Sequence, residues 1–173
     1  LTMNIQLEAK VLREALSQIL TVVDRKNPRA ILTYALLKVE HNEITIEATD
    51  LEVSTKLRIP CEATESGEFC VNPKNLFDLI REMPDKKLTL SLEDQTKVLR
   101  ISCDKINISL LVSETTEFPK LNFEEVNSNL KINSGTFLNL INKTSHAISH
   151  DETRIFLNGI YLQIVDGKLR SVA

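Results

Sequence analysis

The feature that most constrains this chain is an internal repeat, in which the sequence matches itself when it is shifted by 125 residues. At this one offset, apolar residues fall on apolar residues across an alternating run, a helical run and a pair of alternating runs. Repetition of one structural unit predicts a full copy of a domain followed by the beginning of a second. The matched pairs are Ile5 with Leu130, Leu7 with Ile132, Leu12 with Phe137, Ala15 with Leu140, Leu16 with Ile141, Arg29 with Arg154, Leu32 with Leu157, Leu37 with Leu162, Val39 with Ile164, Ile44 with Leu169 and Ala48 with Ala173.

The sequence stops inside the second copy. In the first copy Ala48 is followed by a Thr-Asp pair, whereas its match Ala173 is the last residue of the chain. A domain divided at this point would leave backbone hydrogen-bonding groups and one face of its core unpaired. We therefore expect a first domain at residues 3–124, the beginning of a second at 125–173, and a natural protein longer than this sequence.

Hydrophobic periodicity predicts an α+β fold. Alternation indicates strands at residues 3–8 and 51–59, and apolar residues at three- and four-residue steps indicate an amphipathic helix at residues 9–24. Asn72 is the expected N-cap of a second helix at residues 73–83, which has proline in its first turn. The other predicted elements are a hairpin at 37–46, strands at 69–71, 88–92, 98–101, 106–112, 130–132 and 160–164, a third helix around 137–141, and a polar linker at 113–127.

Composition places the chain among ordinary globular proteins, with 42% hydrophobic and 26% charged residues. No apolar run approaches the roughly 18 residues needed to span a bilayer, so no membrane association is expected. Cys61, Cys70 and Cys103 are too few and too scattered for a disulfide framework, and each lies in an apolar alternating run. We expect buried, reduced thiols and a cytoplasmic location.

Motifs for catalysis are missing from the sequence. The four glycines form no phosphate-binding loop. His146 and His150 lie four residues apart near a helix end and are followed by Asp151, so a metal pair or a small hydrolase site is one hypothesis. The alternative is two polar residues at a helix C-terminus, where a partly charged imidazole suits the dipole. Because no third ligand has suitable spacing, we expect no metal, no cofactor and no enzymatic activity.

Basic residues gather on and around the predicted helices. Arg25, Lys26 and Arg29 place three positive charges in the loop after the first helix, and Lys10 and Arg13 lie on the polar face of that helix. Each one alone is best interpreted as solvated. Together they fit contacts with a phosphate backbone that do not depend on base sequence, and the lack of tryptophan favours a duplex over single strands. The other predicted DNA-binding residues are Lys74, Arg81 and Lys143.

Several stretches together resemble one known family. They are EATDLEVS, VNPKNLFDLIREMP, EFPKL, RIFLNGIYLQ and DGKLRSVA. In order and spacing, over residues 3–173, they resemble the bacterial DNA polymerase III beta subunit, the sliding clamp. The resemblance implies the DNA-clamp fold: three tandem domains, each with two helices packed on antiparallel sheet, of which the third is absent here. It also implies a non-catalytic processivity factor, in which a ring homodimer encircles double-stranded DNA and tethers the replicative DNA polymerase.

The resemblance also suggests roles for individual residues. Lys26 matches a DNA-contacting arginine, and Asp151 falls where clamps can carry a neutral residue that faces DNA, so a carboxylate there would repel phosphate. Ile108 and Leu110 match apolar residues of the dimer interface, and Asn75 matches a position that can be a basic interface residue. Without the resemblance, Ile108 and Leu110 could equally be ordinary core.

Arg154 and Leu157 match residues that border a pocket for partner peptides. In the family this pocket takes short linear motifs from DNA polymerase and clamp-loader subunits. The alternative hypothesis for the whole chain is a repeat-built scaffold for protein interactions with no DNA role. A basic strip confined to the polar faces of the helices would favour the clamp, whereas scattered charges would favour the scaffold.

Overall fold

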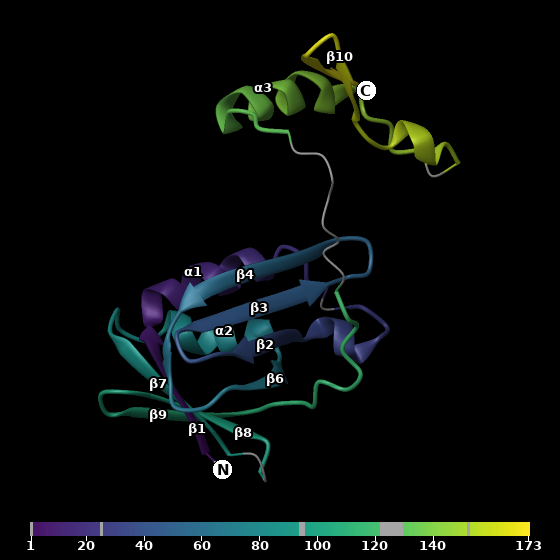
Figure 1. The fold of residues 1–173 in the computed structure, drawn as a ribbon. Helices are drawn as coiled ribbons and strands as arrows, with labels where there is room; N and C mark the ends of the chain where they lie inside the picture. The colour runs from purple at the N-terminus through teal and green to yellow at the C-terminus, as the bar shows by residue number, and fades with distance from the viewer. Residues whose placement is uncertain (1, 25, 94–95, 122–129, 152) are drawn as a thin grey trace. The chain divides into compact units, whose positions relative to one another are not determined.

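The computed structural model describes residues 2–24, 26–93, 96–121, 130–151 and 153–173. The chain divides into two compact units, residues 1–122 and 123–173, which are described separately below (Figure 1). Within the described residues, the first unit contains two antiparallel sheets and two α-helices, and the second contains one α-helix and a two-stranded hairpin.

The larger sheet of the first unit has five strands in the order β5-β1-β7-β8-β9. Alternate residues of its central strands are buried, as the sequence pattern predicted. Strand β9 lies at one edge of the sheet, next to β8. The bounds are β1 (Thr2–Glu8), β5 (Glu62–Ala63), β7 (Lys87–Glu93), β8 (Val98–Cys103) and β9 (Ile106–Leu111).

The smaller sheet has four strands in the order β4-β3-β2-β6. The predicted hairpin around residues 41–43 joins β2 to β3, in a register that pairs Leu37 with Ile46. The bounds are β2 (Ala35–Val39), β3 (Glu43–Thr49), β4 (Ser54–Pro60) and β6 (Gly67–Val71).

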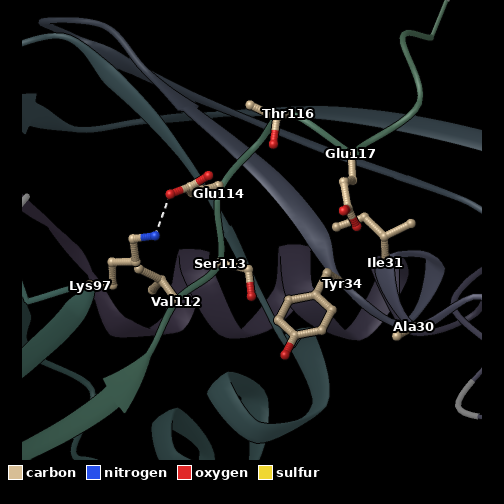
Figure 2. A pocket seen from close by; sticks show the side chains of 9 residues that line it. All are labelled: Ala30, Ile31, Tyr34, Lys97, Val112, Ser113, Glu114, Thr116 and Glu117. Carbon is tan, nitrogen blue, oxygen red and sulfur yellow. Dashed lines mark hydrogen bonds and ion pairs between the residues drawn. The ribbon is translucent and has the colours of Figure 1, made fainter.

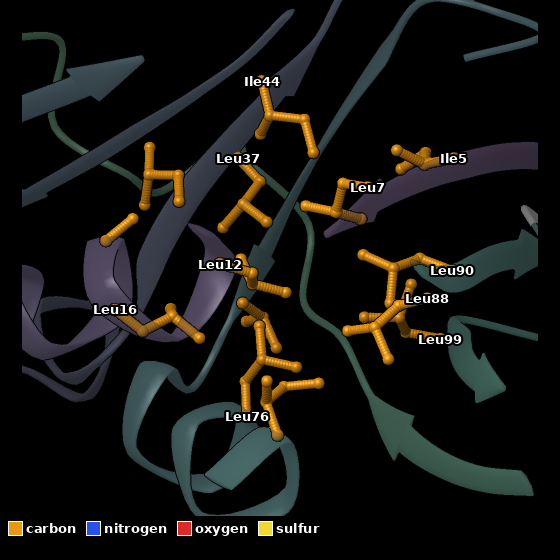
Figure 3. Close-up of a cluster of buried hydrophobic side chains, with 14 of the residues drawn as sticks. Ile5, Leu7, Leu12, Leu16, Leu37, Ile44, Leu76, Leu88, Leu90 and Leu99 are labelled. Atoms are coloured by element: carbon orange, nitrogen blue, oxygen red, sulfur yellow. The ribbon is translucent and has the colours of Figure 1, made fainter. Parts of the chain in front are cut away.

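Helices α1 (Ala9–Ile19) and α2 (Pro73–Arg81) direct their apolar stripes into one core shared with both sheets (Figure 3). Asn72 caps α2 as predicted, because its side-chain oxygen accepts a hydrogen bond from the Asn75 backbone N–H at 3.0 Å. A short 3-10 helix, η1 (Ala30–Thr33), precedes β2. The fully buried side chains include Ile5, Leu12, Leu16, Leu37, Ile44, Leu76, Leu88, Leu90 and Leu99.

The first helix is shorter than predicted, since α1 ends at Ile19 and residues 20–22 form turns. The Thr21 hydroxyl donates to the Gln18 carbonyl at 2.7 Å, a local bond that competes with continued helix. Val23, beyond the end of the helix, is still buried, with only 8% of its surface exposed. The chain packs on the core there without being helical, which is why the apolar period in the sequence extends past α1.

The prediction of a strand starting at Leu51 was wrong, because β4 begins only at Ser54. Leu51 has φ +80°, in the left-handed region, and its side chain is 54% exposed. Asp50 Oδ1 accepts hydrogen bonds from the backbone N–H groups of Glu52 at 2.9 Å and Val53 at 2.6 Å. The side chains of the Thr-Asp pair thus hold a tight turn where alternation alone indicated a strand.

Residues 113–121, predicted as the first part of a linker, pack on the first unit. Ser113 and Cys70 exchange backbone hydrogen bonds of 2.8 and 3.0 Å. Phe118 is 6% exposed and packs with Leu36 and Cys70 in a second, small apolar cluster. The rest of the predicted linker, residues 122–127, lies outside the described residues.

The second unit contains α3 (Ser134–Thr144), the 3-10 turns η2 (Ser145–Ala147) and η3 (Ile155–Leu157), and the hairpin of β10 (Tyr161–Val165) and β11 (Lys168–Val172). The predicted third helix and the strand at 160–164 are thus confirmed. None of the described side chains of α3 is buried.

The structure confirms the repeat at the level of hydrogen-bond register. The limits of α3 are those of α1 moved by the repeat offset. The pair Leu36–Glu47 of the β2–β3 ladder recurs as Tyr161–Val172 in the β10–β11 ladder, again at that offset. Since a slip of one residue would turn every side chain to the other face, identical register means that matched side chains lie on equivalent faces of the two hairpins.

The strand predicted at residues 130–132 does not form among the described residues. In the first unit its match, β1, is paired on both sides, by β5 and β7. The described part of the second unit contains no strands besides β10 and β11. Alternation produces a strand only where a partner supplies hydrogen bonds, and Leu130 is 53% exposed here.

The three cysteines are buried and free, as expected. Burial raises the pKa of the Cys70 thiol to about 12, so this thiol is an inert packing group. No helix among the described residues is long and apolar enough to cross a membrane.

Leu51 yields a test of the turn. Replacing it with glycine removes the steric cost of a left-handed leucine, about 1–2 kcal/mol, at an entropic cost of about 0.5–1 kcal/mol. We expect Leu51→Gly to raise the free energy of unfolding by up to about 1 kcal/mol in urea denaturation. Val53→Gly is the matched control, since Val53 is 53% exposed without a positive φ and should lose stability. Equal losses of stability in both variants would contradict the proposed backbone strain at Leu51.

Candidate nucleic-acid interface

The polar face of α1 and the loop after it carry three exposed cations among the predicted DNA-binding residues. Lys10 is exposed in the first turn of α1, and Lys26 and Arg29 are exposed in the following loop. The loop is ordered by side-chain caps. Asp24 Oδ1 accepts from the Lys26 backbone N–H at 2.9 Å, and Asn27 Oδ1 accepts from the Arg29 N–H at 3.0 Å.

These cations form a strip and not a cluster. Nine residue steps of 1.5 Å each separate Lys10 from the end of α1 at Ile19, which is about 14 Å along the helix axis. No ion pair within the described residues engages Lys10, Lys26 or Arg29. Glu14 is also exposed on α1, so this surface is of mixed charge with a basic excess at its two ends. Such an arrangement suits weak contact with separated phosphates.

The two predicted cations of α2 have local carboxylate partners. Lys74 pairs with Asp78 one turn away, and its Nζ lies 5.9 Å from the centroid of the Phe77 ring. Arg81 Nε lies 3.2 Å from the Glu82 carboxylate. Lys74 is partly exposed and Arg81 is exposed, and each lies beside a carboxylate that offsets part of its charge.

Arg13 has a different environment from the other cations. Its side chain is 24% exposed, and Nη1 lies 2.6 Å from Asp85 Oδ1. Nη2 donates to the carbonyl oxygen of Ile80, in the last turn of α2, at 3.4 Å and to that of Met83, just after the helix, at 3.1 Å. The guanidinium therefore makes its hydrogen bonds within the first unit.

Two further cations that are predicted to contact DNA lie outside the part of the structure that defines this strip. Arg25 lies outside the described residues. Lys143 is exposed in the last turn of α3, in the second unit. For all eight cations, contact with DNA stays a prediction.

The predicted interface residues Ile108 and Leu110 lie on β9, the edge of the five-stranded sheet. Both are partly buried and pack against the core, whereas Leu111, on the other face of the strand, is 73% exposed. An edge strand presents unpaired backbone groups that another strand can complete. Asn75 is exposed on α2, and its interface role stays a prediction.

Arg154 and Leu157 lie on one turn of the second unit, built around Asp151. Asp151 Oδ1 accepts from the Thr153 hydroxyl at 2.6 Å and the Thr153 backbone N–H at 2.9 Å. These two hydrogen bonds lower the pKa of the Asp151 carboxyl. Arg154 Nε lies 3.9 Å from the same carboxylate, and Leu157 is 43% exposed. Asp151 thus organises the turn on which both predicted pocket residues lie.

The hypothesis of a metal pair at His146 and His150, which the sequence did not favour, gains no support from the geometry. Among the described residues, no group of three or more His, Cys, Asp and Glu side chains could hold a metal ion. His146 lies in η2, and His150 follows it in irregular structure.

A pocket of about 420 Å³ lies in the first unit between η1 and the segment that follows β9 (Figure 2). Tyr34 lines it, and an ion pair between Lys97 and Glu114 lies at its border. The hydrogen bond from Lys97 lowers the pKa of the Glu114 carboxyl. None of the predicted site residues lines this pocket, and its exposed charges are largely paired with each other.

Sequence reasoning missed the residues that shape the loops. Asp24, Asn27 and Asp151 each accept a backbone N–H from two residues further along the chain. An Asp or Asn at the start of a polar loop is the signal that could have identified them. Glu47 was missed as well: it is buried between Lys38 and Lys56, at 3.2 and 3.4 Å, on neighbouring strands.

Taken together, the structure defines an α+β protein of the DNA-clamp class, in whose described residues a helix and hairpin of the first unit recur in the second, and in whose first unit two helices pack on two sheets. Residues 3–122 match the family model of the DNA polymerase III beta subunit, N-terminal domain. The chain belongs to the DNA polymerase III beta subunit family.

Relatives in this family resemble the chain over nearly its whole length. It is 30% identical to the beta sliding clamps of Caulobacter vibrioides and Pseudomonas aeruginosa, over 99% of this chain and 47% of each relative. A crystal structure of the DNA polymerase III subunit beta from P. aeruginosa matches with a TM-score of 0.90 and 27% identity, over 98% of this chain and 46% of that one. The sliding clamp of Caulobacter crescentus matches with a TM-score of 0.88 and 28% identity, over 96% and 46%. The chain thus spans about half the length of these relatives.

The Asp151 turn can be tested by titration. Because the folded pKa is lowered, the hydrogen bonds to Thr153 stabilise the turn above the ordinary carboxyl pKa and are lost as the pH falls through the lowered value. We expect the Thr153 amide resonance to shift with a midpoint below the ordinary Asp range, and Asp151→Asn to abolish this titration. The Thr136 amide, held at 3.1 Å by the neutral side chain of Asn133, is the control and should not titrate. A Thr153 amide resonance whose titration midpoint lies at the unperturbed Asp pKa would contradict the hydrogen bonds between Asp151 and Thr153.

Proposed function

We propose that this chain is the N-terminal part of a processivity clamp, a ring homodimer that encircles double-stranded DNA and tethers the replicative DNA polymerase. The supporting observation is the match in fold over 98% of the chain to a DNA polymerase III beta subunit, at a TM-score of 0.90. In this proposal residues 3–124 form the first clamp domain, residues 125–173 begin the second, and a third domain completes the protein. The clamp itself catalyses nothing and acts in the cytoplasm.

Contact with DNA is electrostatic in this proposal. Lys10, Lys26 and Arg29 are exposed and without carboxylate partners in the described structure, so they can approach phosphates without first breaking an ion pair. Lysine contacts phosphate as a point charge and lacks the two-pronged geometry of arginine. Weak contacts of this kind hold the ring centred on the duplex and still permit sliding. Tethering then raises the effective concentration of the polymerase at the primer end.

Assembly and partner binding use other surfaces. The open edge of β9 is the surface proposed to meet the partner subunit, with Ile108 and Leu110 anchoring the strand in the core behind it. Arg154 and Leu157 form one border of a pocket for short linear motifs of polymerase and clamp-loader subunits. Leu157 is half exposed, so it can contact an apolar anchor of such a peptide.

The topological mechanism has a direct test on the protein encoded by the complete gene. After loading, a ring should remain on nicked circular duplex through a wash at high salt and should be lost when the circle is cut. Retention on linear DNA with free ends would instead indicate ordinary binding. Failure to bind either form would favour the scaffold hypothesis.

A charge-reversal pair tests the basic strip in this chain. We expect Lys26→Glu to weaken binding to a short duplex and to reduce the slope of log affinity against log salt by about 0.9 per lost phosphate contact. The measurement is NMR titration of the chain with duplex at several salt concentrations. Lys105→Glu makes the same charge change at an exposed turn between β8 and β9, and should leave the slope unchanged. Equal effects of both variants would show only a response to net charge.

A further inference from the structure

Arg13 joins α1 to the end of α2 through three hydrogen bonds. Nη1 donates to Asp85 Oδ1 at 2.6 Å, and Nη2 donates to the carbonyl oxygens of Met83 at 3.1 Å and Ile80 at 3.4 Å. All three acceptors are at least 67 residues away in sequence. A single side chain of α1 therefore fixes where the chain leaves α2.

The chemistry at the end of α2 explains why a guanidinium is used. The last carbonyl groups of a helix lack intrahelical donors, and a cation there also interacts favourably with the helix dipole. Arginine can serve two carbonyls and one carboxylate at once with its planar fork, whereas a lysine ammonium cannot reproduce that geometry. Arg13 Nε is buried without a hydrogen-bond partner. One N–H group thus stays without a hydrogen bond, while the two terminal nitrogens both reach acceptors.

The same geometry argues against a direct phosphate contact. Arg13 is 24% exposed, and both terminal nitrogens already donate to protein acceptors. A phosphate held by both terminal nitrogens would have to displace the Asp85 carboxylate or the carbonyls at the end of α2. The second copy carries Leu138 at the matching position of α3, a helix with the same limits, so the repeat does not require a cation there to form the helix.

We propose that Arg13 is a positioning residue that does not itself touch DNA. Together with Asp85 it sets α1 against α2, so that the neighbouring exposed cations meet the duplex together. This inference rests on the proposed function. Lys10 lies one helical turn before Arg13, and Arg81 lies in the last turn of α2. A shift between the helices changes the spacing of these charges. The proposal therefore assigns to Asp85, an acidic residue, a favourable effect on binding to an anion.

Asp85→Asn is the decisive variant, because charge and position predict opposite results. Removing a carboxylate should strengthen duplex binding if only charge matters. If positioning matters, we expect this variant to bind a short duplex about threefold more weakly than wild type in NMR titration at low salt. Binding as tight as wild type, or tighter, would overturn the proposal.

Substitutions of Arg13 provide the second readout. We expect Arg13→Met and Arg13→Lys to weaken binding by a similar factor, with no change in the slope of log affinity against log salt. A lost phosphate contact would lower that slope by about 0.9, and the lysine variant would then retain most of the affinity. The double variant Arg13→Met with Asp85→Asn should bind no more weakly than either single variant, since both remove one interaction. A slope that falls in Arg13→Met overturns the proposal.

Amide exchange separates this inference from the proposed function. We expect Arg13→Met and Asp85→Asn to speed exchange at the last turn of α2 by the same factor, while Lys10→Met leaves it unchanged. If the wild-type chain binds no duplex, the proposed DNA contact fails, and the exchange data alone decide whether Arg13 and Asp85 position α2. Unchanged exchange in both variants would overturn the positioning role whatever the DNA result.

Discussion

The packing of α1 and α2 into a core shared by both sheets is the constraint on which the rest of the first unit depends. Leu12 and Leu16 of α1, with Leu76 and Ile80 of α2, are fully buried. Each such side chain contributes about 1.5–3 kcal/mol on burial, so the helices cannot rotate without losing much of the stability of the unit. The outward direction of their polar faces follows from this packing. The direction of the basic strip thus follows from the core, to which the Arg13–Asp85 link adds a contact at the end of α2.

The sequence contained enough information to predict this core. Alternation and helical period identified the central strands and both helices, because a buried face imposes apolar residues at a fixed period whatever the neighbours are. The repeat added information that one copy could not supply. The two copies share one hairpin register, so matched apolar positions such as Leu37 and Leu162 lie at equivalent places in their hairpins, although only Leu37 is buried in the described structure.

The candidate site was less predictable, for physical reasons that individual residues illustrate. The helical period correctly places Arg13 on the polar face of its helix. Its partner Asp85 is 72 residues away in sequence, and no local sequence pattern predicts this pairing. Lys74 and Arg81 lie beside carboxylates one turn or one residue away, which only side-chain geometry reveals. Alternation failed at Leu51 and at Leu130 for two distinct reasons. A side-chain cap outweighed it at the first, and a partner strand was lacking at the second.

The distribution of charge is also compatible with the proposed contact with DNA, although the chain has a net charge of −3. Most ion pairs of the described structure join nearby surface groups, such as Lys86 with Asp104 and Lys97 with Glu114, which leaves little net field from these cations. A few cations without such partners then dominate the local potential along α1. A uniformly basic surface would hold a duplex at many phosphates and resist movement along it. In the proposed clamp, a sparse strip on a rigid core would give contacts that are individually weak, so that a duplex could exchange phosphates past them without leaving the protein.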